Sequence, residues 1–201
     1  MPRLADHEQR RREITDAVRR VIARSGLEGT TFQSVAAEAG ISVRLVQYYF
    51  GNKKELLNAT HHAVITDAAL RFGKRLTTLT EPASPRETLR IIATELMPLD
   101  ERRRADAVVL ANFHAATLSG DGASIDRSVG TVNALVDVIA EQLRRAGAQP
   151  DLATLDAQVL ALCLAGFAQG LVTDATTAEH ADTLLARLFD RFLPRGTVGR
   201  S

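Results

Sequence analysis

Apolar residues recur along most of the chain at intervals of three and four positions. Over residues 6–24 they include Ile14, Val18 and Val21, and over residues 125–143 the same alternation continues through the whole segment. Such intervals place side chains on one face of an α-helix, whereas a half-buried β-strand needs an alternation with a period of two, which no segment sustains. The pattern therefore predicts an all-α protein.

Residues that begin and end helices divide this pattern into about nine elements. Gly26, Gly40 and Gly147 each follow the last periodic residue of a segment, and Ser84-Pro85-Arg86-Glu87 has the form of a capping box with proline at the first helical position. The longest predicted helix is long enough to connect two domains. The predicted helices cover about residues 6–24, 31–39, 42–50, 52–79, 84–97, 101–118, 125–146, 154–173 and 177–192.

Charge is distributed unevenly between the two ends of the chain. The net charge is +1, but residues 1–60 carry ten Lys and Arg against seven Asp and Glu, whereas residues 61–201 carry fifteen against seventeen. Because neutralisation of phosphates supplies most non-specific affinity for nucleic acid, a basic N-terminal segment suits a nucleic-acid-binding region. Ordinary surface charge is the alternative explanation for so small an excess.

The sequence lacks the patterns of membrane proteins and of common enzymes. No apolar run approaches the roughly 20 residues of a membrane span, the first twelve residues lack the apolar stretch of a secretory signal, and one cysteine, Cys163, cannot form an intrachain disulfide. No phosphate-binding loop, nucleophile elbow or metal-ligand spacing occurs either. We therefore expect a cytoplasmic protein that is not an enzyme and has no catalytic residues, metal site or cofactor.

Residues 30–57 carry the most specific pattern in the chain. They form two predicted short helices separated by the turn Ala39-Gly40-Ile41-Ser42, in which glycine permits a left-handed backbone and serine caps the following helix. In the second helix, Val43, Val46 and Phe50 are spaced to pack inward. This arrangement is typical of a helix-turn-helix.

The same spacing leaves Arg44, Gln47 and Tyr48 together on the outer face of the second helix. In the major groove, Arg pairs with guanine edges, Gln with adenine edges, and Tyr with phosphates or thymine methyl groups. A solvated surface is the alternative for these three residues, and Lys53 is likewise either solvent-facing or a phosphate contact. We interpret the second helix as one that reads DNA bases.

The segment resembles the N-terminal signature of the TetR family of repressors over about residues 8–60. The order and spacing of the matching elements agree with that signature, and the main departure is Gln47, where many members place tyrosine. The C-terminal part is similar to the choline-responsive repressor-like branch through LMPLDERRR and ALCLAGFAQGLVTDAT, which does not imply choline as the ligand. The matching N-terminal elements are Thr31, Val35-Ala36, Ala39-Gly40-Ile41-Ser42, Tyr49-Phe50, Lys53 and Leu56.

The resemblance implies domains, partners and site residues for this chain. It implies a three-helix helix-turn-helix domain at residues 1–55 and a helical ligand-binding and dimerisation domain at 56–195. Residues 196–201 are expected to be a disordered tail, because disorder concentrates at chain termini. The implied function is that of a repressor that binds palindromic, double-stranded operator DNA as a homodimer and is released by an unknown small-molecule effector. The residues expected to contact DNA are Thr31, Ser42, Val43, Arg44, Gln47, Tyr48, Tyr49 and Lys53.

An effector pocket is expected where apolar and polar residues of the second domain converge. His114 shares an apolar helical face with Leu110, Phe113 and Thr117. A hydrogen-bonded core histidine is the more usual role there, and a polar anchor in a mainly apolar pocket is the functional one. The residues expected to bind the effector are Phe72, Met97, Leu110, Phe113, His114, Thr117, Asn133 and Phe167.

The predicted eighth and ninth helices have more apolar surface than one domain can cover. Residues 154–173 are apolar on nearly every side, and residues 177–192 carry Leu184, Leu188 and Phe192 in register. Gly166 and Gly170 suit either intrachain packing or the close approach of two copies. We expect a homodimer formed through these two helices.

Two other classes of protein remain as alternatives to a regulator. One is an all-α enzyme or ligand-binding bundle, and the other is a helical interaction module.

Overall fold

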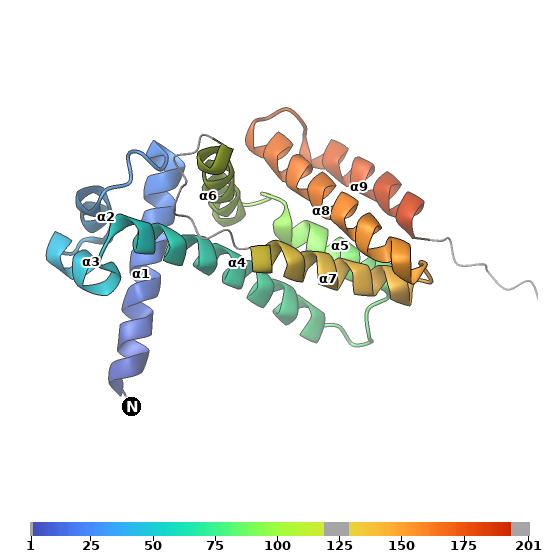
Figure 1. Ribbon diagram of the computed structural model, residues 1–201, viewed down its shortest axis with the longest axis horizontal. Coiled ribbons are helices and arrows are strands. Elements are labelled where there is room, and N and C mark those ends of the chain that lie inside the picture. The colour runs from blue at the N-terminus through green and yellow to red at the C-terminus, as the bar shows by residue number, and fades with distance from the viewer. Residues whose placement is uncertain (1, 119–128, 194–201) are drawn as a thin grey trace, which may run out of the picture. The chain divides into compact units, whose positions relative to one another are not determined.

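The computed structural model describes residues 2–118 and 129–193 of the chain, and for residues 2–5, 114, 117, 118 and 129–133 it describes the backbone alone. The described residues form helices and no strand, which confirms the all-α prediction (Figure 1). The helices are α1 (Pro2–Ser25), α2 (Phe32–Ala39), α3 (Val43–Phe50), α4 (Lys53–Thr77), α5 (Pro85–Leu96), α6 (Glu101–Leu118), α7 (Val129–Arg145), α8 (Pro150–Val172) and α9 (Ala178–Phe192).

Two helix starts differ from the sequence prediction. α1 begins at Pro2 rather than near Asp6, and α8 begins at Pro150 rather than near Thr154. Proline is tolerated in the first turn of a helix, where its missing N–H would have no partner, so in both cases it starts the helix earlier than the apolar spacing alone indicates. The predicted first residues of α7, 125–128, and the tail 196–201 lie outside the described residues.

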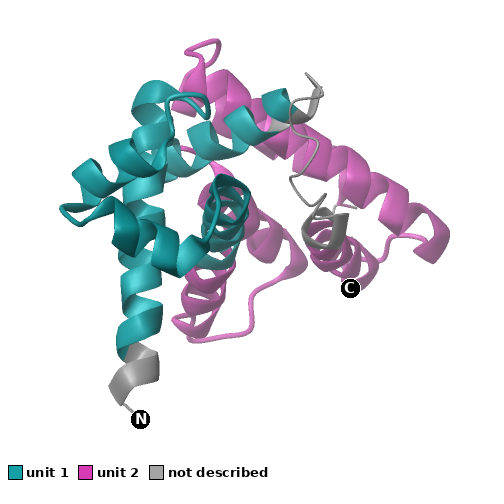
Figure 2. Ribbon diagram, turned by 60° about the vertical axis from the view of Figure 1, so that its left-hand side comes forward, with its two compact units in different colours: residues 1–68, 100–127 teal, residues 69–99, 128–201 magenta. Residues whose placement is uncertain are grey.

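The chain folds into two compact units (Figure 2). One unit is made from residues 1–68 and 100–127 and the other from residues 69–99 and 128–201, so α4 contributes its first part to one unit and its last part to the other. These units describe packing. The predicted boundary between residues 55 and 56 divides a DNA-binding domain from a ligand-binding domain by function rather than by packing, and it stays a prediction.

The core of the first unit is built on the apolar face of α1. Ile14, Val18 and Val21 are fully buried, as their spacing predicts, and each contributes about 1.5–3 kcal/mol by leaving water. Against them pack the inner faces of the helix-turn-helix, the first part of α4 and one face of α6. Those partners are Val35, Ala36, Val46, Phe50, Leu56, Val64, Val109 and Phe113.

The core of the second unit lies between α5, α7, α8 and α9. Ile139 and Leu143 of α7 are fully buried, and the small side chains of Ala153 and Ala157 on α8 are buried beside the same core. Small residues at a helix contact permit a short distance between the helix axes. In α9 the buried face is Ala181, Leu185 and Phe189. The predicted stripe of Leu184, Leu188 and Phe192 therefore flanks the core of this unit instead of filling it.

The outer face of α8 is apolar and exposed. Leu152, Leu155, Val159 and Leu162 follow one another at intervals of three, four and three along it, and all four are exposed. By length and composition α8 is the one described helix that could cross a membrane. That is weak evidence of a membrane span, because apolar helices of globular proteins pass the same test.

Candidate nucleic-acid interface and effector site

The helix-turn-helix begins with a closed capping box at Thr31. The Ser34 backbone N–H donates to Thr31 Oγ1 at 3.0 Å, and the Thr31 backbone N–H donates to Ser34 Oγ at 2.9 Å. These two backbone N–H groups, which have no partner within the helix, are therefore satisfied. The capping box holds Thr31 at the exposed start of α2, at the position where the sequence predicts a DNA contact.

The turn between α2 and α3 depends on Gly40 and Ser42. Gly40 has φ 66° and ψ 31°, in the left-handed region, and a Cβ added there would meet no atom within 4 Å. The need for glycine is therefore torsional rather than steric. Ser42 accepts a hydrogen bond from the Leu45 N–H at 3.2 Å and so fixes the first turn of α3, as predicted.

The outer face of α3 is polar and open. Val46 and Phe50 are buried, Val43 packs partly against the same core, and Arg44, Gln47 and Tyr48 are exposed, Tyr48 by 75%. Within the described part of the chain the Arg44 and Gln47 side chains make no hydrogen bond or ion pair. Their donors and acceptors are therefore available to the edges of base pairs.

Arg11 ties the end of α3 to α1. Its Nη1 donates to the backbone oxygen of Tyr49 at 2.6 Å, and its guanidinium lies 4.4 Å from the centre of the Phe50 ring. A cation at a helix C-terminus is favourable because the last carbonyls carry partial negative charge. The sequence offered no sign of this contact, since Arg11 and Tyr49 are 38 positions apart.

Tyr49 and Lys53 join α3 to its surroundings. Tyr49 is half-buried, and its ring centre is 4.7 Å from that of His7 and 5.3 Å from that of Tyr48. Lys53 Nζ donates to the backbone oxygen of Leu27 at 3.0 Å while the side chain stays exposed. An ammonium group has three N–H donors, so this bond leaves donors for a phosphate.

Glu38 clamps α2 to α1. Its carboxylate accepts from Arg20 Nε at 2.6 Å and from Arg24 Nη2 at 3.1 Å. These hydrogen bonds, first from Arg20 and then from Arg24, hold the pKa of Glu38 below its usual value. The clamp fixes α2, the helix that precedes α3.

A buried ion-pair network joins α1, α4 and α6 within the first unit. Arg19 Nη1 lies 3.2 Å from Asp106 Oδ1, and Arg19 Nη2 lies 2.7 Å from Asp67 Oδ2. The Arg19 and Asp106 side chains are only 6% and 7% exposed. Burial raises the pKa of Asp67, but the hydrogen bonds from Arg19 and Arg102 lower this pKa by more than burial raises it. The net shift of the pKa is therefore downward. Sequence analysis missed this network, because its members are far apart in the chain.

The residues predicted to bind an effector are divided between the two units. Met97 is buried in the core of the second unit, and Phe72 and Phe167 are half-buried against that core. Leu110 and Phe113 belong to the core of the first unit, where the Phe113 ring centre is 4.9 Å from that of His61. The side chains of His114, Thr117 and Asn133 lie outside the described residues. The predicted set of effector contacts stays a prediction.

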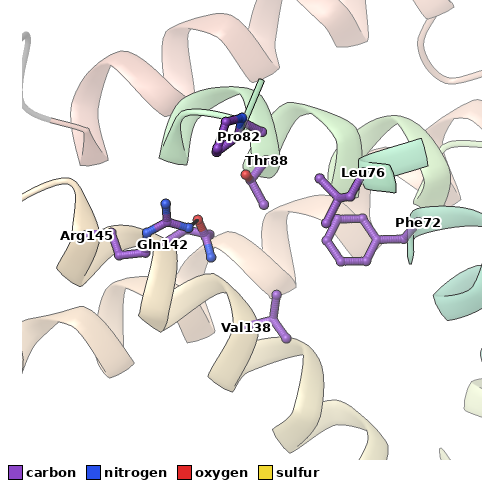
Figure 3. Close-up of a pocket in the computed structure, with 8 residues that line it drawn as sticks. Phe72, Leu76, Pro82, Thr88, Val138, Gln142 and Arg145 are labelled. Carbon is purple, nitrogen blue, oxygen red and sulfur yellow. Dashed lines mark hydrogen bonds between the residues drawn. The ribbon is translucent and has the colours of Figure 1, made fainter. Parts of the chain in front are cut away.

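A cavity of about 380 Å³ opens in the second unit between the end of α4, the start of α5 and the end of α7 (Figure 3). Of the predicted effector residues, Phe72 is the one that lines it. In the described ranges, no group of three or more His, Cys, Asp or Glu side chains is placed to hold a metal ion. The lining residues are Phe72, Leu76, Pro82, Ala83, Thr88, Val138, Gln142 and Arg145.

Comparisons of sequence identify relatives of the helix-turn-helix region. Residues 14–60 match the family model "Bacterial regulatory proteins, tetR family". The HTH-type transcriptional regulator BetI of Paraburkholderia phymatum is 38% identical over 120 residues, which are 60% of this chain and 52% of the relative. BetI of Burkholderia cenocepacia is 37% identical over 119 residues, which are 59% of this chain and 52% of the relative. The chain thus matches about half the length of these curated relatives.

Solved structures share the fold of nearly the whole chain. A transcriptional regulator from Rhodococcus sp. Rha1 is 24% identical with a TM-score of 0.77, over 90% of this chain and 95% of the other. A putative transcriptional regulator from Saccharomonospora viridis, crystallised in complex with choline, is 21% identical with a TM-score of 0.77, over 91% and 96%. The relatives named here are transcription regulators rather than enzymes, in agreement with the sequence prediction. The family-model match confirms the predicted resemblance at the capped helix-turn-helix, and the solved structures share the helical fold over nearly the whole chain, so residues 14–60 carry the N-terminal region of the TetR family of bacterial regulatory proteins.

Proposed function

We propose that the chain is a ligand-responsive transcription regulator, a repressor, that binds palindromic operator DNA in the cytoplasm as a homodimer. The exposed face of Arg44, Gln47 and Tyr48 on α3 carries this proposal. The capping of α2 and α3 and the contacts of Arg11 hold that face in one orientation, which is what base recognition requires. The relatives are named as transcriptional regulators, which supports the same function.

The DNA contacts proposed here fall into reading and anchoring groups. Arg44 and Gln47 would read base edges, because the side chains of these two residues have no other described partner. Tyr48, whose ring contacts that of Tyr49, would lie beside them. Lys53 would anchor the phosphate backbone from the start of α4. Four further residues would place the backbone near the DNA: the short, exposed Thr31 and Ser42 and the partly buried Val43 and Tyr49.

The homodimer is proposed to form through the outer faces of α8 and α9. The exposed stripe of Leu155, Val159 and Leu162 repeats at intervals of four and three, as the seam between paired helices does. Gly170 has an intrachain reason, since a Cβ there would lie 3.2 Å from Thr176, whereas Gly166 is exposed and open. Two copies related by a twofold axis would form a four-helix interface and place the reading helices about 34–36 Å apart.

Substitutions in the two groups of DNA contacts should have different effects. We expect Arg44→Ala or Gln47→Ala to reduce discrimination at particular operator base pairs by about 1–3 kcal/mol, because each removes a contact to base edges. We expect Lys53→Ala to weaken binding to all sequences alike and to reduce the salt dependence of the affinity. Fluorescence-anisotropy titrations of operator variants at several salt concentrations measure both quantities.

The control for these titrations is Lys54→Ala, one position from Lys53 and exposed. Thermal melting of each variant checks the fold, because Lys53 also donates to the Leu27 carbonyl. If all three substitutions lower affinity equally for every sequence, the division into reading and anchoring residues is wrong.

A further inference from the structure

The cavity of the second unit has a polar end with more donors than acceptors (Figure 3). Arg145 Nη1 donates to Gln142 Oε1 at 3.1 Å, which uses the amide acceptor of Gln142 and one of the five N–H donors of the guanidinium. Gln142 and Thr88 are only 8% and 4% exposed. Among the described residues, the Gln142 amide N–H groups, the Thr88 hydroxyl and the remaining Arg145 N–H groups have no hydrogen-bond partner.

The other end of the cavity is apolar. Phe72 and Leu76 of α4 approach it from one side and Val138 of α7 from another, as Figure 3 shows. No acidic residue is among the described residues that line the cavity, and the nearby Glu141 carboxylate lies 3.4 Å from Arg144 Nη1. One end of the cavity is therefore cationic and rich in donors, and the other is hydrophobic.

We propose that this cavity binds an amphipathic monocarboxylate. The carboxylate would accept hydrogen bonds from Arg145, the Gln142 amide and the Thr88 hydroxyl, and an alkyl or aryl group would lie against the apolar residues. Arg and carboxylate match in geometry as well as charge, and about 380 Å³ lies within the range of roughly 300–1,000 Å³ of small-molecule sites. That this ligand is the effector rests on the proposed function, whereas the binding itself does not.

The lining does not suit a quaternary ammonium ligand such as choline. Recognition of such cations depends on several aromatic faces or on an anionic group. This cavity has one aromatic residue, Phe72, and its charged residue, Arg145, has the same sign as the ligand. The choline found in the structural neighbour from Saccharomonospora viridis is therefore not expected to bind here.

Calorimetric titration of the full chain without DNA tests the site directly. The probes are octanoate, octylammonium and choline chloride, so that the first two differ only in their head group. We expect octanoate to bind, and Arg145→Gln to weaken its binding about tenfold or more, because a charge-assisted pair is lost. Arg145→Glu should abolish octanoate binding and admit octylammonium. Arg144→Gln is the matched control, since Arg144 does not line the cavity, and it should change octanoate affinity less than about twofold.

The proposal is overturned if octanoate does not bind the wild-type chain, if choline binds this cavity as tightly as octanoate, or if Arg144→Gln and Arg145→Gln have equal effects. A second titration, of operator DNA with and without octanoate, examines the effector role separately. Release of operator by octanoate in the wild type but not in Arg145→Gln supports that role. Binding of octanoate without any change in operator affinity refutes the effector role and leaves the carboxylate site standing. Absence of operator binding in both conditions refutes the proposed function instead.

Discussion

Replacement of Arg19 by Met is expected to lower the free energy of unfolding by about 3–5 kcal/mol, because it breaks a buried ion pair from one side. The guanidinium lies against three carboxylates, Asp67 at 2.7 Å, Asp106 at 3.2 Å and the more exposed Asp16 at 3.7 Å. A methionine fills a similar space, but it removes this cationic partner from Asp106 and Asp67 in a region largely shielded from water. Urea denaturation at a fixed protein concentration, followed by circular dichroism, measures the change.

Arg20→Met is the matched control for Arg19→Met. Arg20 is the next residue of the same helix and also pairs with a carboxylate, Glu38, but its side chain is exposed. Exposed ion pairs contribute about 0–1 kcal/mol, so this variant should unfold close to the wild type. Equal destabilisation by the two substitutions would contradict the assignment of the network as a buried support of the helix-turn-helix unit.

The loss of unfolding free energy caused by Arg19→Met should decrease as the pH falls. Because the pKa of Asp67 is lower in the folded protein than in the unfolded chain, its contribution to stability is present above the unfolded value of about 3.9 and is lost as the pH falls through the folded value. The difference in stability between wild type and Arg19→Met should therefore narrow as the pH falls below about 4. A difference that widens on acidification would mean that Asp67 is not stabilised as the anion.

Replacement of Leu162 by Glu should raise the dissociation constant of the proposed homodimer by about a hundredfold or more, because a charge would be buried in the proposed apolar interface. Leu162 is 74% exposed in the single chain, so the folded protomer has no reason to be harmed. Leu70→Glu is the matched control, because Leu70 is also an exposed leucine but lies on α4, outside the α8 stripe. Sedimentation velocity over a range of micromolar concentrations separates the two variants.

The dimer proposal makes a further demand on these variants. Leu162→Glu should lose high-affinity operator binding together with dimerisation, since one chain contacts only one half-site. A wild-type chain that sediments as a monomer at micromolar concentration, or a Leu70→Glu variant that dissociates as readily as Leu162→Glu, would contradict an interface on α8 and α9.

The elements that sequence analysis predicts well are those whose causes are local. Gly40 determines the turn through its backbone conformation and Ser42 through its side chain. The spacing of apolar residues by three and four positions determines which side of α3 faces inward. Both causes act within about one turn of helix, so they can be recognised from residues that are close together in the sequence. The exposed position of Arg44 follows from the same spacing.

The features that sequence analysis misses depend on contacts between distant segments. Arg19 and Asp106 are 87 positions apart, and nothing in either segment indicates that the charges meet in the core. Gln142 and Arg145 stand near the end of a helix, where such residues are usually solvated. Apolar spacing also cannot separate a residue that lines a cavity, such as Phe72, from one packed in a core, such as Phe113.

The most direct test of the proposed function is an electrophoretic mobility-shift titration of the full chain with the DNA upstream of its own gene. The account predicts a discrete complex containing two chains per palindromic site. It should be retained in excess unrelated DNA and be lost in the Arg44→Ala, Gln47→Ala double variant, whose substituted side chains are exposed and outside the core. Equal affinity for unrelated DNA of the same length, or unchanged specificity in the double variant, would contradict it.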